Sequence, residues 1–481
     1  MIIEPAGLPP SLPAHVCQRA LDARDARFDG LFFVGIVTTG IYCRPTCPSR
    51  RATPDHRRFF NSAAAAESSG FRPCLRCRPE LAPGQTMINA VSRLASTAAY
   101  RIDAGALNGR SVADLAAELG VSERHLRRAL RRELGVSPVE LAQTHRLLLA
   151  KRLLAETALS VTDIAFASGF ESLRRFNFVF HERYGMSPSA LRRPLMKEGR
   201  RAPSDLLRMT LAYRPPLAWD VLTAFLRGEA TPGVEIVEGR RYGRTVRLDG
   251  RTGVVFVEDS PAAVHLKVDV SPSLLPVLMP LLARLRQLFD LDAQPAVVDA
   301  HLERGGLTLQ RRGVRLPGAL DGFEVGFRTL LGARDLAGRV AAALGEPVDT
   351  GYPALDRLAP DAGRLAEVET SSLVELGVAR RRAEVLLAFA CAVVEGTLRL
   401  DPGGDVAETH RALMEITGIG ERLATTIVTR ALYWPDAFPL SDRALQDAAG
   451  ASTPRALRAR AETWRPWRAY AALHLRLRLT P

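Results

Sequence analysis

Four cysteines in two close pairs constrain this sequence more than any other feature. The first pair is Cys43 and Cys47, the second is Cys74 and Cys77, and 26 residues separate the pairs. Four thiolates spaced in this way are typical of a tetrahedral Zn2+ site, and a small loop-rich module often needs a metal to fold. We therefore expect one zinc ion held by these four thiolates, a pattern of reducing compartments rather than of disulfide scaffolds.

The length of 481 residues predicts several domains, because one hydrophobic core seldom serves so long a chain. With 47% hydrophobic residues, the chain can bury several cores. Four stretches differ in composition, and the fold class that they predict is multidomain. We expect a small α+β zinc module at 1–82, an all-α double helix-turn-helix at 86–194, an α+β domain at 205–318 and an all-α domain at 319–481.

Local patterns add detail to the later stretches. A polar linker is expected at Met196–Pro203, strands at Thr252–Glu258 and Val264–Val270, and an apolar helix at Leu274–Phe289. The longest clean apolar run, Val385–Val394, is too short to span a bilayer. The first residues lack the pattern of a secretory signal, so we expect a cytoplasmic protein that uses no membrane.

Positive charge is concentrated in the first two fifths of the chain. Residues 1–100 carry 12 Lys and Arg against 7 Asp and Glu, and residues 101–201 carry 18 against 11. The remaining 280 residues carry 35 against 34. This distribution favours DNA as a partner of the first two domains, since basic side chains gain affinity by releasing counterions from phosphates. The alternative is an Arg-rich composition without a binding role.

Residues around the cysteines carry a specific resemblance. The segments Asp25–Gly30, Phe33–Pro45 and Gly70–Pro79 closely resemble the N-terminal domain of the adaptive-response (Ada) regulator, over nearly all of residues 10–82. This resemblance implies that Cys43 is a zinc ligand and also the nucleophile that removes a methyl group from a methylphosphotriester in DNA. The residues that match family positions holding the DNA backbone are Thr39, Arg50 and Arg72.

Simple electrostatics agrees with that chemistry. Four thiolates on Zn2+ leave a net charge of about −2, so the sulfurs stay electron-rich at neutral pH. A phosphotriester is neutral, and an anionic centre can approach it without repulsion. Once Cys43 becomes a thioether, one negative charge is lost, and we expect DNA affinity to rise. Nothing in the sequence would regenerate the thiol, so the reaction is expected to be stoichiometric; Cys17 and Cys391 are expected to be packed side chains.

One motif occurs twice in the basic helical stretch. Ser111–Leu130 and Ser160–Phe180 each predict a helix, a tight turn and a second helix, about fifty residues apart. Gly120 and Gly169 lie in the two turns, and Ser122 and Ser172 are expected to cap the second helices. The exposed positions expected on the second helices are Glu123, Arg124, Arg127, Arg128, Arg174, Arg175 and Asn177.

Residues 104–193 resemble the AraC/XylS-type DNA-binding domain throughout, including Gly135–Pro138 and Tyr184–Pro188. The resemblance implies that this domain binds promoter DNA, controls alkylation-repair genes and has RNA polymerase as a partner. For single arginines a solvated surface role is the alternative. Arg-rich recognition helices fit many G-containing sites, so the sequence does not specify the operator.

The last stretches carry a second set of motifs. Leu413–Ala424 predicts a helix-hairpin-helix in which Gly418 and Gly420 let backbone amides grip a DNA phosphate. Asp442 follows 22 residues after Gly420. With Leu316–Arg328 and Trp464–His474, residues 205–481 resemble 3-methyladenine DNA glycosylase II. This implies that Asp442 is the carboxylate that stabilises the positive sugar when a flipped alkylated base leaves, without a metal, redox or nucleotide cofactor.

Several residues of this half depart from the family pattern. Thr417 replaces the usual proline before the hairpin glycine, and aromatic pocket residues are replaced by Arg422, Arg443 and Arg476. Arginine beside a cationic base is electrostatically unfavourable. Arg422 also takes the position of the Schiff-base lysine of strand-cleaving relatives, which predicts a monofunctional glycosylase.

Three hypotheses follow for the whole chain. The first is a fused regulator and repair enzyme that accepts methyl on Cys43 and excises alkylated bases with Asp442. The second is a zinc-dependent methyl-sensing transcription factor with an inactive glycosylase half. The third is a zinc-stabilised DNA-binding protein that accepts no methyl group. The set of excised bases and the oligomeric state do not follow from the sequence.

Overall fold

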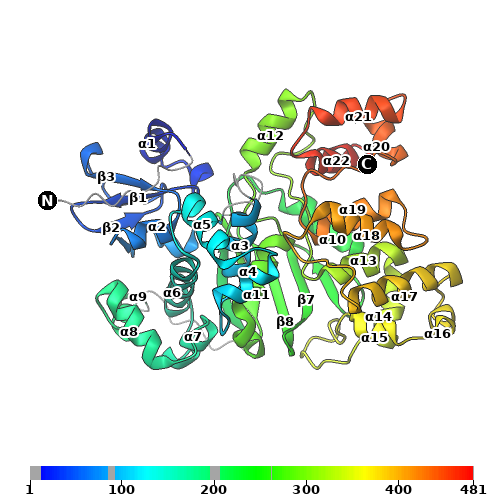
Figure 1. The fold of residues 1–481 in the computed structure, drawn as a ribbon, viewed down its shortest axis with the longest axis horizontal. Coiled ribbons are helices and arrows are strands. Elements are labelled where there is room, and N and C mark those ends of the chain that lie inside the picture. The colour runs from blue at the N-terminus through cyan, green and yellow to red at the C-terminus, as the bar shows by residue number, and fades with distance from the viewer. Residues whose placement is uncertain (1–11, 85–92, 196–205, 262, 480–481) are drawn as a thin grey trace. The chain divides into compact units, whose positions relative to one another are not determined.

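The computed structural model describes residues 12–84, 93–195, 206–261 and 263–479. It divides into two compact units (Figure 1). The first consists of Met1–Arg214 with Ser260–Ala283, and the second of Pro215–Asp259 with Arg284–Pro481. The linker predicted at Met196–Pro203 lies outside the described residues.

A small four-stranded sheet organises the cysteine module of the first unit. The strands lie in the order β3-β1-β2-β4, with β4 parallel to β2 and the other pairs antiparallel. Their bounds are β1 Phe33–Ile36, β2 Ile41–Cys43, β3 Arg57–Phe60 and β4 Arg72–Pro73, and the helices of the module are α1 Ala14–Ala23 and α2 Ala63–Ser68. Because side chains alternate along a strand, Cys43 packs with one apolar cluster and Tyr42 with another.

Seven helices follow in the described part of the first unit. They are α3 Arg93–Asp103, α4 Val112–Glu118, α5 Glu123–Leu134, α6 Pro138–Glu156, α7 Val161–Ala167, α8 Leu173–Tyr184 and α9 Pro188–Leu195. Two pairs of them, α4 with α5 and α7 with α8, form the two predicted helix-turn-helix motifs. Ser122 and Ser172 cap α5 and α8 as predicted, each accepting a hydrogen bond from a backbone N–H three residues later. Gly120 and Gly169 have positive φ in the turns, which only glycine adopts without strain. Helix α6 buries residues on several sides and links the motifs.

Strands of the predicted α+β stretch occur in both units. In the first unit, β5 Leu207–Ala212 pairs antiparallel with β9 His265–Val270. In the second unit, β6 Glu235–Glu238, β7 Arg241–Leu248 and β8 Arg251–Asp259 form an antiparallel meander beside α10 Trp219–Glu229. Both predicted strands are therefore confirmed. The helix predicted at Leu274–Phe289 begins as a 3-10 segment, Pro272–Val277, which contains Pro276, and continues as α11 Leu278–Leu288.

The rest of the second unit is helical, as predicted. Its helices are α12 Pro295–Arg304, α13 Gly322–Leu331, α14 Arg334–Leu344, α15 Ala362–Ala366, α16 Thr370–Glu375, α17 Arg380–Val394, α18 Val406–Glu415, α19 Glu421–Ala431, α20 Arg443–Ala448, α21 Pro454–Glu462 and α22 Arg468–Leu477. Among the described residues, no helix combines the length and the apolar character needed to cross a bilayer.

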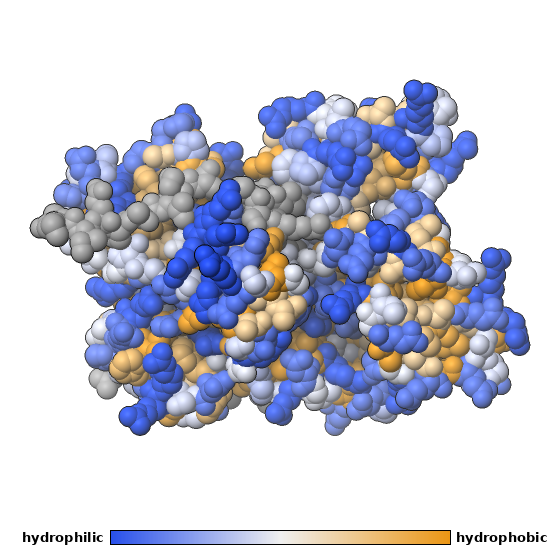
Figure 2. All heavy atoms as spheres, in the orientation of Figure 1, coloured by the Kyte–Doolittle hydropathy of each residue, from blue (hydrophilic) through white to orange (hydrophobic). Residues whose placement is uncertain are grey.

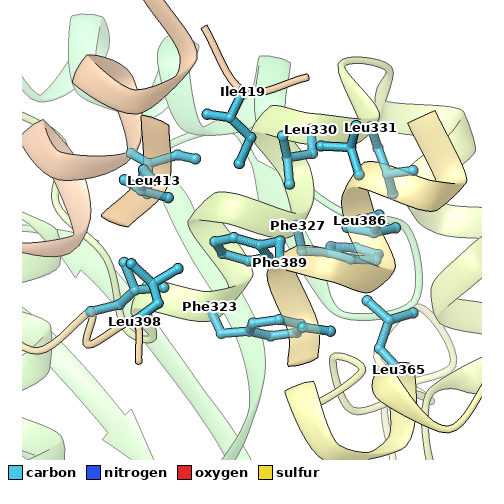
Figure 3. Close-up of a cluster of buried hydrophobic side chains, with 14 of the residues drawn as sticks. Phe323, Phe327, Leu330, Leu331, Leu365, Leu386, Phe389, Leu398, Leu413 and Ile419 are labelled. Carbon is cyan, nitrogen blue, oxygen red and sulfur yellow. The ribbon is translucent and has the colours of Figure 1, made fainter. Parts of the chain in front are cut away.

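Two apolar clusters hold these helices together. The larger one surrounds α13 and α17, where the rings of Phe323 and Phe389 stack with centroids 5.4 Å apart (Figure 3). Gly326 is required there, because a Cβ atom would lie 2.1 Å from the Phe389 ring. The smaller cluster contains Trp464, which is fully buried, so this residue of the Trp464–His474 motif serves the core.

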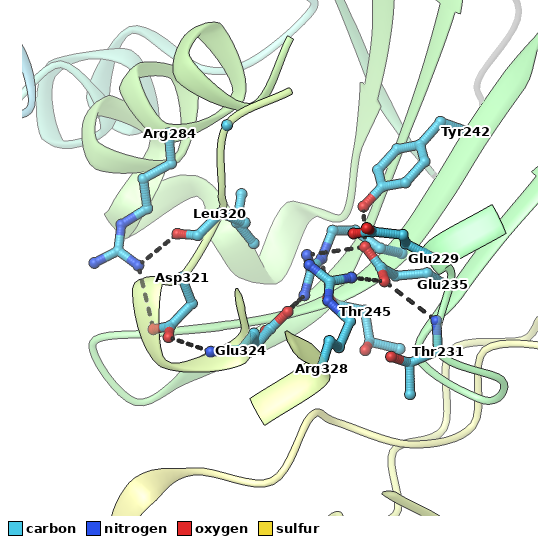
Figure 4. A network of polar contacts seen from close by, with 12 residues as sticks. Glu229, Thr231, Glu235, Tyr242, Thr245, Arg284, Leu320, Asp321, Glu324 and Arg328 are labelled. Carbon is cyan, nitrogen blue, oxygen red and sulfur yellow. Dashed lines mark hydrogen bonds and ion pairs between the residues drawn. The ribbon is translucent and has the colours of Figure 1, made fainter. Parts of the chain in front are cut away.

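A buried ionic network joins the meander to α13 (Figure 4). Arg244 on β7 donates to both oxygens of Glu324 at 2.7 and 2.8 Å and lies 3.4 Å from Glu235 on β6. Arg328 also pairs with Glu235. Burial disfavours the charge of Glu235, but Arg328 and Arg244 outweigh that effect and lower its pKa to about 2. These charges fix α13 against the sheet within the second unit.

Candidate metal centre and DNA interface

The four predicted ligands meet in one place. Cys43 ends β2, Cys47 follows in the next turn, and Cys74 and Cys77 follow β4. The parallel pairing of β2 with β4 brings the two pairs together, with the Cys74 N–H donating to the Tyr42 carbonyl at 3.0 Å. All four sulfurs are buried and lie within 4.8 Å of one another.

This geometry fits a tetrahedral zinc site. Zn–S bonds of about 2.3 Å place neighbouring sulfurs roughly 3.8 Å apart, which the observed spread of sulfurs accommodates. Four thiol donors without a carboxylate or imidazole are also the soft donor set that zinc prefers. The chain therefore has a site for one zinc ion held by Cys43, Cys47, Cys74 and Cys77.

Arg44 and Asp29 link the strand that carries Cys43 to Cys77, and the sequence analysis assigned them no role. The Arg44 side chain donates to Asp29 at 2.8 Å and to the carbonyl of Cys77 at 3.2 Å. The backbone N–H of Arg44 donates to the sulfur of Cys77 at 3.4 Å. Asp29 lies within the Asp25–Gly30 segment, and Arg44 lies between Cys43 and Cys47. Both residues therefore belong to the motifs that carry the resemblance, but the sequence alone did not indicate that they contact each other.

The two remaining cysteines differ from each other. Cys17 is fully buried in the core of the module, as predicted, and burial raises the pKa of its thiol to about 11. Cys391 lies on α17 and is only partly buried.

The residues predicted to hold the DNA backbone are all exposed. Thr39 lies in the turn between β1 and β2, Arg72 begins β4, and Arg50 follows the first cysteine pair. Further exposed arginines of the module are Arg51, Arg58 and Arg76. The buried four-cysteine cluster is thus accompanied by surface cations on the same small module.

Helix α5 presents a basic surface. Hydrophilic side chains gather over this helix in Figure 2. An open depression runs along it, lined by Glu123, Arg124, Arg127, Arg128, Arg131 and Arg132. Arg124 and Arg128 are exposed, whereas Arg127 is half-buried and its Nε donates to Glu123 at 2.7 Å. The structure thus leaves Arg124 and Arg128 more accessible than Arg127.

Helix α8 presents Arg174, Arg175 and Asn177 to solvent, as predicted. It also exposes Phe178, a residue to which the sequence analysis gave no role. The guanidinium of Arg175 lies 5.7 Å from the centre of the Phe178 ring. An exposed aromatic ring beside a cation suits contact with a thymine methyl group or a base edge.

The predicted hairpin lies between α18 and α19. Gly418 has a φ of 101°, and a Cβ atom there would lie 2.4 Å from Val385, so glycine is required. Gly420 caps α19 without a side-chain hydrogen bond. The first amides of α19 are therefore not satisfied by a cap side chain, which is the arrangement needed to bind a phosphate.

Asp442 caps α20 and is paired with an arginine. One carboxylate oxygen accepts the Leu445 N–H at 3.3 Å, and the other accepts from Arg476 of α22 at 3.1 Å. The Asp442 side chain is 12% exposed. Arg443 is 85% exposed and lies 3.6 Å from Asp447 instead, and Arg422 is exposed at the start of α19. Of the three arginines that distinguish this chain, Arg476 is the one found bound to Asp442.

Family models match three parts of the chain. The metal-binding domain of Ada matches residues 16–80, a helix-turn-helix domain matches residues 115–194, and the AlkA N-terminal domain matches residues 208–321. These matches agree with the predicted fusion of three kinds of domain.

Curated relatives match the whole chain and its parts. A probable bifunctional transcriptional activator/DNA repair enzyme AlkA of Mycobacterium tuberculosis is 36% identical over 95% of this chain and 95% of the relative. DNA-3-methyladenine glycosylase 2 of Escherichia coli is 36% identical over 55% of this chain and 95% of its own length. The Escherichia coli bifunctional transcriptional activator/DNA repair enzyme Ada is 31% identical over 35% of this chain and 46% of its own. The chain therefore belongs to the family of bifunctional transcriptional activator and DNA repair enzymes of the AlkA type.

Proposed function

We propose that this protein senses and repairs DNA alkylation, and that Cys43 accepts a methyl group from methylphosphotriesters. The observation that carries the proposal is the buried four-cysteine centre, with Cys43 at the end of a strand and exposed basic side chains on the same module. Similarity to the Ada and AlkA relatives supports it. A cytoplasmic location accords with the reduced state that the four thiols require.

The transfer needs an electron-rich sulfur and a neutral substrate. Bound zinc would keep the four sulfurs deprotonated and leave the centre with a charge of about −2. The Cys43 thiolate attacks the methyl carbon, an S–C bond forms as the C–O bond breaks, and the electron pair leaves with the phosphate as an ordinary diester. The protein is consumed, because the thioether is not reopened.

Hydrogen bonding favours Cys43 over Cys77 as the sulfur that accepts the methyl group. The sulfur of Cys77 accepts the N–H of Arg44, which withdraws electron density from it. Among the described residues, no donor from outside the cysteine set bonds the sulfur of Cys43. The lone pairs of the Cys43 sulfur are therefore less engaged in hydrogen bonding than those of the Cys77 sulfur.

Peptide mapping by mass spectrometry tests the methyl transfer. The protein is incubated with DNA that carries methylphosphotriesters, digested and compared with a Cys43→Ser variant. We expect one added methyl group on the peptide containing Cys43. Methylation of another cysteine, or of none, would refute the proposal and leave a zinc-stabilised DNA-binding protein.

The helix-turn-helix domain is proposed to bind promoter DNA through α5 and α8 and to act with RNA polymerase. The residues proposed for DNA contact there are Arg124, Arg127, Arg128, Arg174, Arg175 and Asn177, and those on the cysteine module are Thr39, Arg50 and Arg72. Footprinting on the promoters of alkylation-repair genes tests this role. Protection that persists after Arg124→Ala and Arg174→Ala together would contradict it.

The second unit is proposed to be a monofunctional glycosylase for alkylated bases of the 3-methyladenine type. The N-glycosidic bond breaks, its electron pair leaves with the cationic base, the Asp442 carboxylate stabilises the positive sugar, and water adds with loss of a proton. Gly418 and Gly420 are proposed to place backbone amides on a phosphate nearby. The relative DNA-3-methyladenine glycosylase 2 supports this activity.

A specific observation favours a second candidate, a methyl-sensing transcription factor whose glycosylase half is inactive. The carboxylate of Asp442 is bound by Arg476, and that positive charge opposes the role of Asp442 in stabilising another cation. Release of bases from alkylated DNA, measured against an Asp442→Asn variant, separates the candidates. Release by the native protein that the variant lacks supports the glycosylase, and equal rates for both leave only the regulator.

A further inference from the structure

Helix α6 of the helix-turn-helix domain reaches the cysteine centre. Lys151 of α6 donates to the carbonyl of Cys74 at 3.3 Å and forms an ion pair with Glu80. Only 1% of Lys151 is exposed. Both partners belong to the cysteine module, so a side chain of the DNA-binding domain contacts the backbone of a metal ligand.

The other end of the same ligand pair is tied to α6 as well. Arg78 directly follows Cys77 and lies 3.2 Å from Glu156, in the last turn of α6. Arg78 also lies 3.1 Å from Glu80. The Cys74–Cys77 pair is thus held between two residues of one helix, five positions apart.

The first cysteine pair is held differently. Arg44 follows Cys43 directly in the chain, and its side chain donates to Asp29, which also belongs to the cysteine module, at 2.8 Å. Tyr42 of β2 and Thr144 of α6 both donate to the carboxylate of Glu67 on α2, at 3.0 and 3.2 Å. Among the described residues, no hydrogen bond or ion pair joins Cys43 to α6, whereas α6 bonds to the segment that carries Cys74 and Cys77.

The burial of Lys151 has to be offset by favourable contacts. Desolvation of an ammonium group is costly, and an apolar residue of similar volume often serves stability as well as a buried ion pair does. Neutralising Glu80 explains the charge of Lys151 but not its hydrogen bond to Cys74. Groups that orient metal ligands from outside the ligand set commonly change metal affinity by about ten- to a hundredfold when removed.

We propose that Lys151 is a positioning residue of the metal centre: it fixes the Cys74–Cys77 pair from the helix-turn-helix domain, with Glu156 acting through Arg78. Zinc binding and the arrangement of α6 are then coupled. The inference rests on the proposed function, since it concerns the centre that carries Cys43.

Zinc affinity of the full-length protein, measured by competition with a chromogenic chelator, tests the proposal. Lys151→Met is expected to lower zinc affinity by about ten- to a hundredfold. Lys267→Met on β9 is the matched control and is expected to bind zinc as the native protein does. Circular dichroism follows folding in each variant.

A charge-balanced variant separates positioning from simple destabilisation. Lys151→Met leaves Glu80 buried without its lysine, whereas Lys151→Met with Glu80→Leu removes both charges and leaves Arg78 paired with Glu156. If Lys151 positions Cys74, the double variant regains thermal stability but keeps the reduced zinc affinity. Recovery of native zinc affinity in the double variant, or no loss in Lys151→Met, would overturn the proposal.

Failure of the proposed function gives a different result. A native protein that binds no zinc, or that binds zinc and accepts no methyl on Cys43, refutes the proposed function. A native protein that does both, with unchanged affinity in both Lys151 variants, refutes only the inference about α6.

Discussion

The cysteine centre and the Asp442 site are built in opposite ways. At the cysteine centre, the charged side chains of Arg44 and Lys151 donate to the carbonyls of Cys77 and Cys74. Within the part of the chain that the structure describes, no donor from outside the cysteine set bonds the sulfur of Cys43. At the other site, the proposed catalytic carboxylate is itself bound by a cation, Arg476. The supporting cations therefore bond to ligand carbonyls at the cysteine centre, whereas at the other site a cation bonds directly to the carboxylate that is proposed to act in catalysis.

Loss of one metal ligand is expected to have the largest effect. In Cys74→Ser the zinc site loses a thiolate, and metal binding that contributes on the order of 10 kcal/mol to folding of such a module is lost. We expect no bound zinc by elemental analysis, an unfolded cysteine module and no methyl transfer. Cys391→Ser, outside the cluster, is the control. A Cys74→Ser protein that retains stoichiometric zinc would show that Cys74 is not a required zinc ligand.

The buried ionic network between β6, β7 and α13 is expected to contribute strongly to the stability of the second unit. Glu235→Gln leaves Arg244 and Arg328 short of a buried partner and is expected to cost about 3 kcal/mol of the free energy of unfolding of the second unit. Urea denaturation measures this change. An effect below about 0.5 kcal/mol would show that the network of Figure 4 does not lock α13 to the sheet.

The same network predicts a dependence of stability on pH. The pKa of Glu235 is lowered to about 2 in the folded protein, below the value of about 4.3 of an unfolded chain. Its stabilising contribution is therefore complete above pH 4.3 and is lost as pH falls toward about 2. The native protein should lose more stability than Glu235→Gln over that interval, and parallel curves would contradict the assignment.

Removing Arg476 tests whether its ion pair with Asp442 slows base release. In Arg476→Leu the carboxylate loses its cation, and we expect base release from alkylated DNA to rise roughly fivefold, equivalent to about 1 kcal/mol for a partly exposed pair. Arg443→Leu is the matched control, because the side chain of Arg443 pairs with Asp447 and not with the Asp442 carboxylate. A slower rate in Arg476→Leu would mean that the arginine orients the carboxylate rather than opposing it.

Methylation of Cys43 is expected to have a smaller effect, a change in DNA affinity. Methylation of Cys43 removes one negative charge, so DNA affinity should rise and its dependence on salt should steepen by about one unit of slope. Binding titrations across a range of salt concentrations, before and after methyl transfer, measure both quantities. Asp442→Asn should respond to methylation as the native protein does, because its carboxylate takes no part in this switch.

Local motifs allowed much of this structure to be predicted. The cysteine spacing predicted the metal ligands, and Ser122, Ser172, Gly120 and Gly169 marked helix boundaries because caps and turns depend on neighbouring residues. The hairpin at Gly418 was predicted for the same reason.

Contacts between distant residues could not be predicted in this way. Lys151 and Cys74 are separated by 77 positions, and Arg244 and Glu324 by 80. Neither spacing has a periodic signal, because these pairs form only when separate elements pack together. The pairing of Asp442 with Arg476 likewise depends on how α22 lies beside α20, and the sequence indicated only that an unusual arginine was present.

The central claim is that Cys43 accepts one methyl group per protein molecule, and intact-protein mass spectrometry during titration with methylphosphotriester DNA tests it most directly. Methyl incorporation should rise to one group per molecule, stop there with DNA in excess, and be absent in Cys43→Ser. Incorporation in Cys43→Ser, or no incorporation by the zinc-loaded native protein, would contradict it.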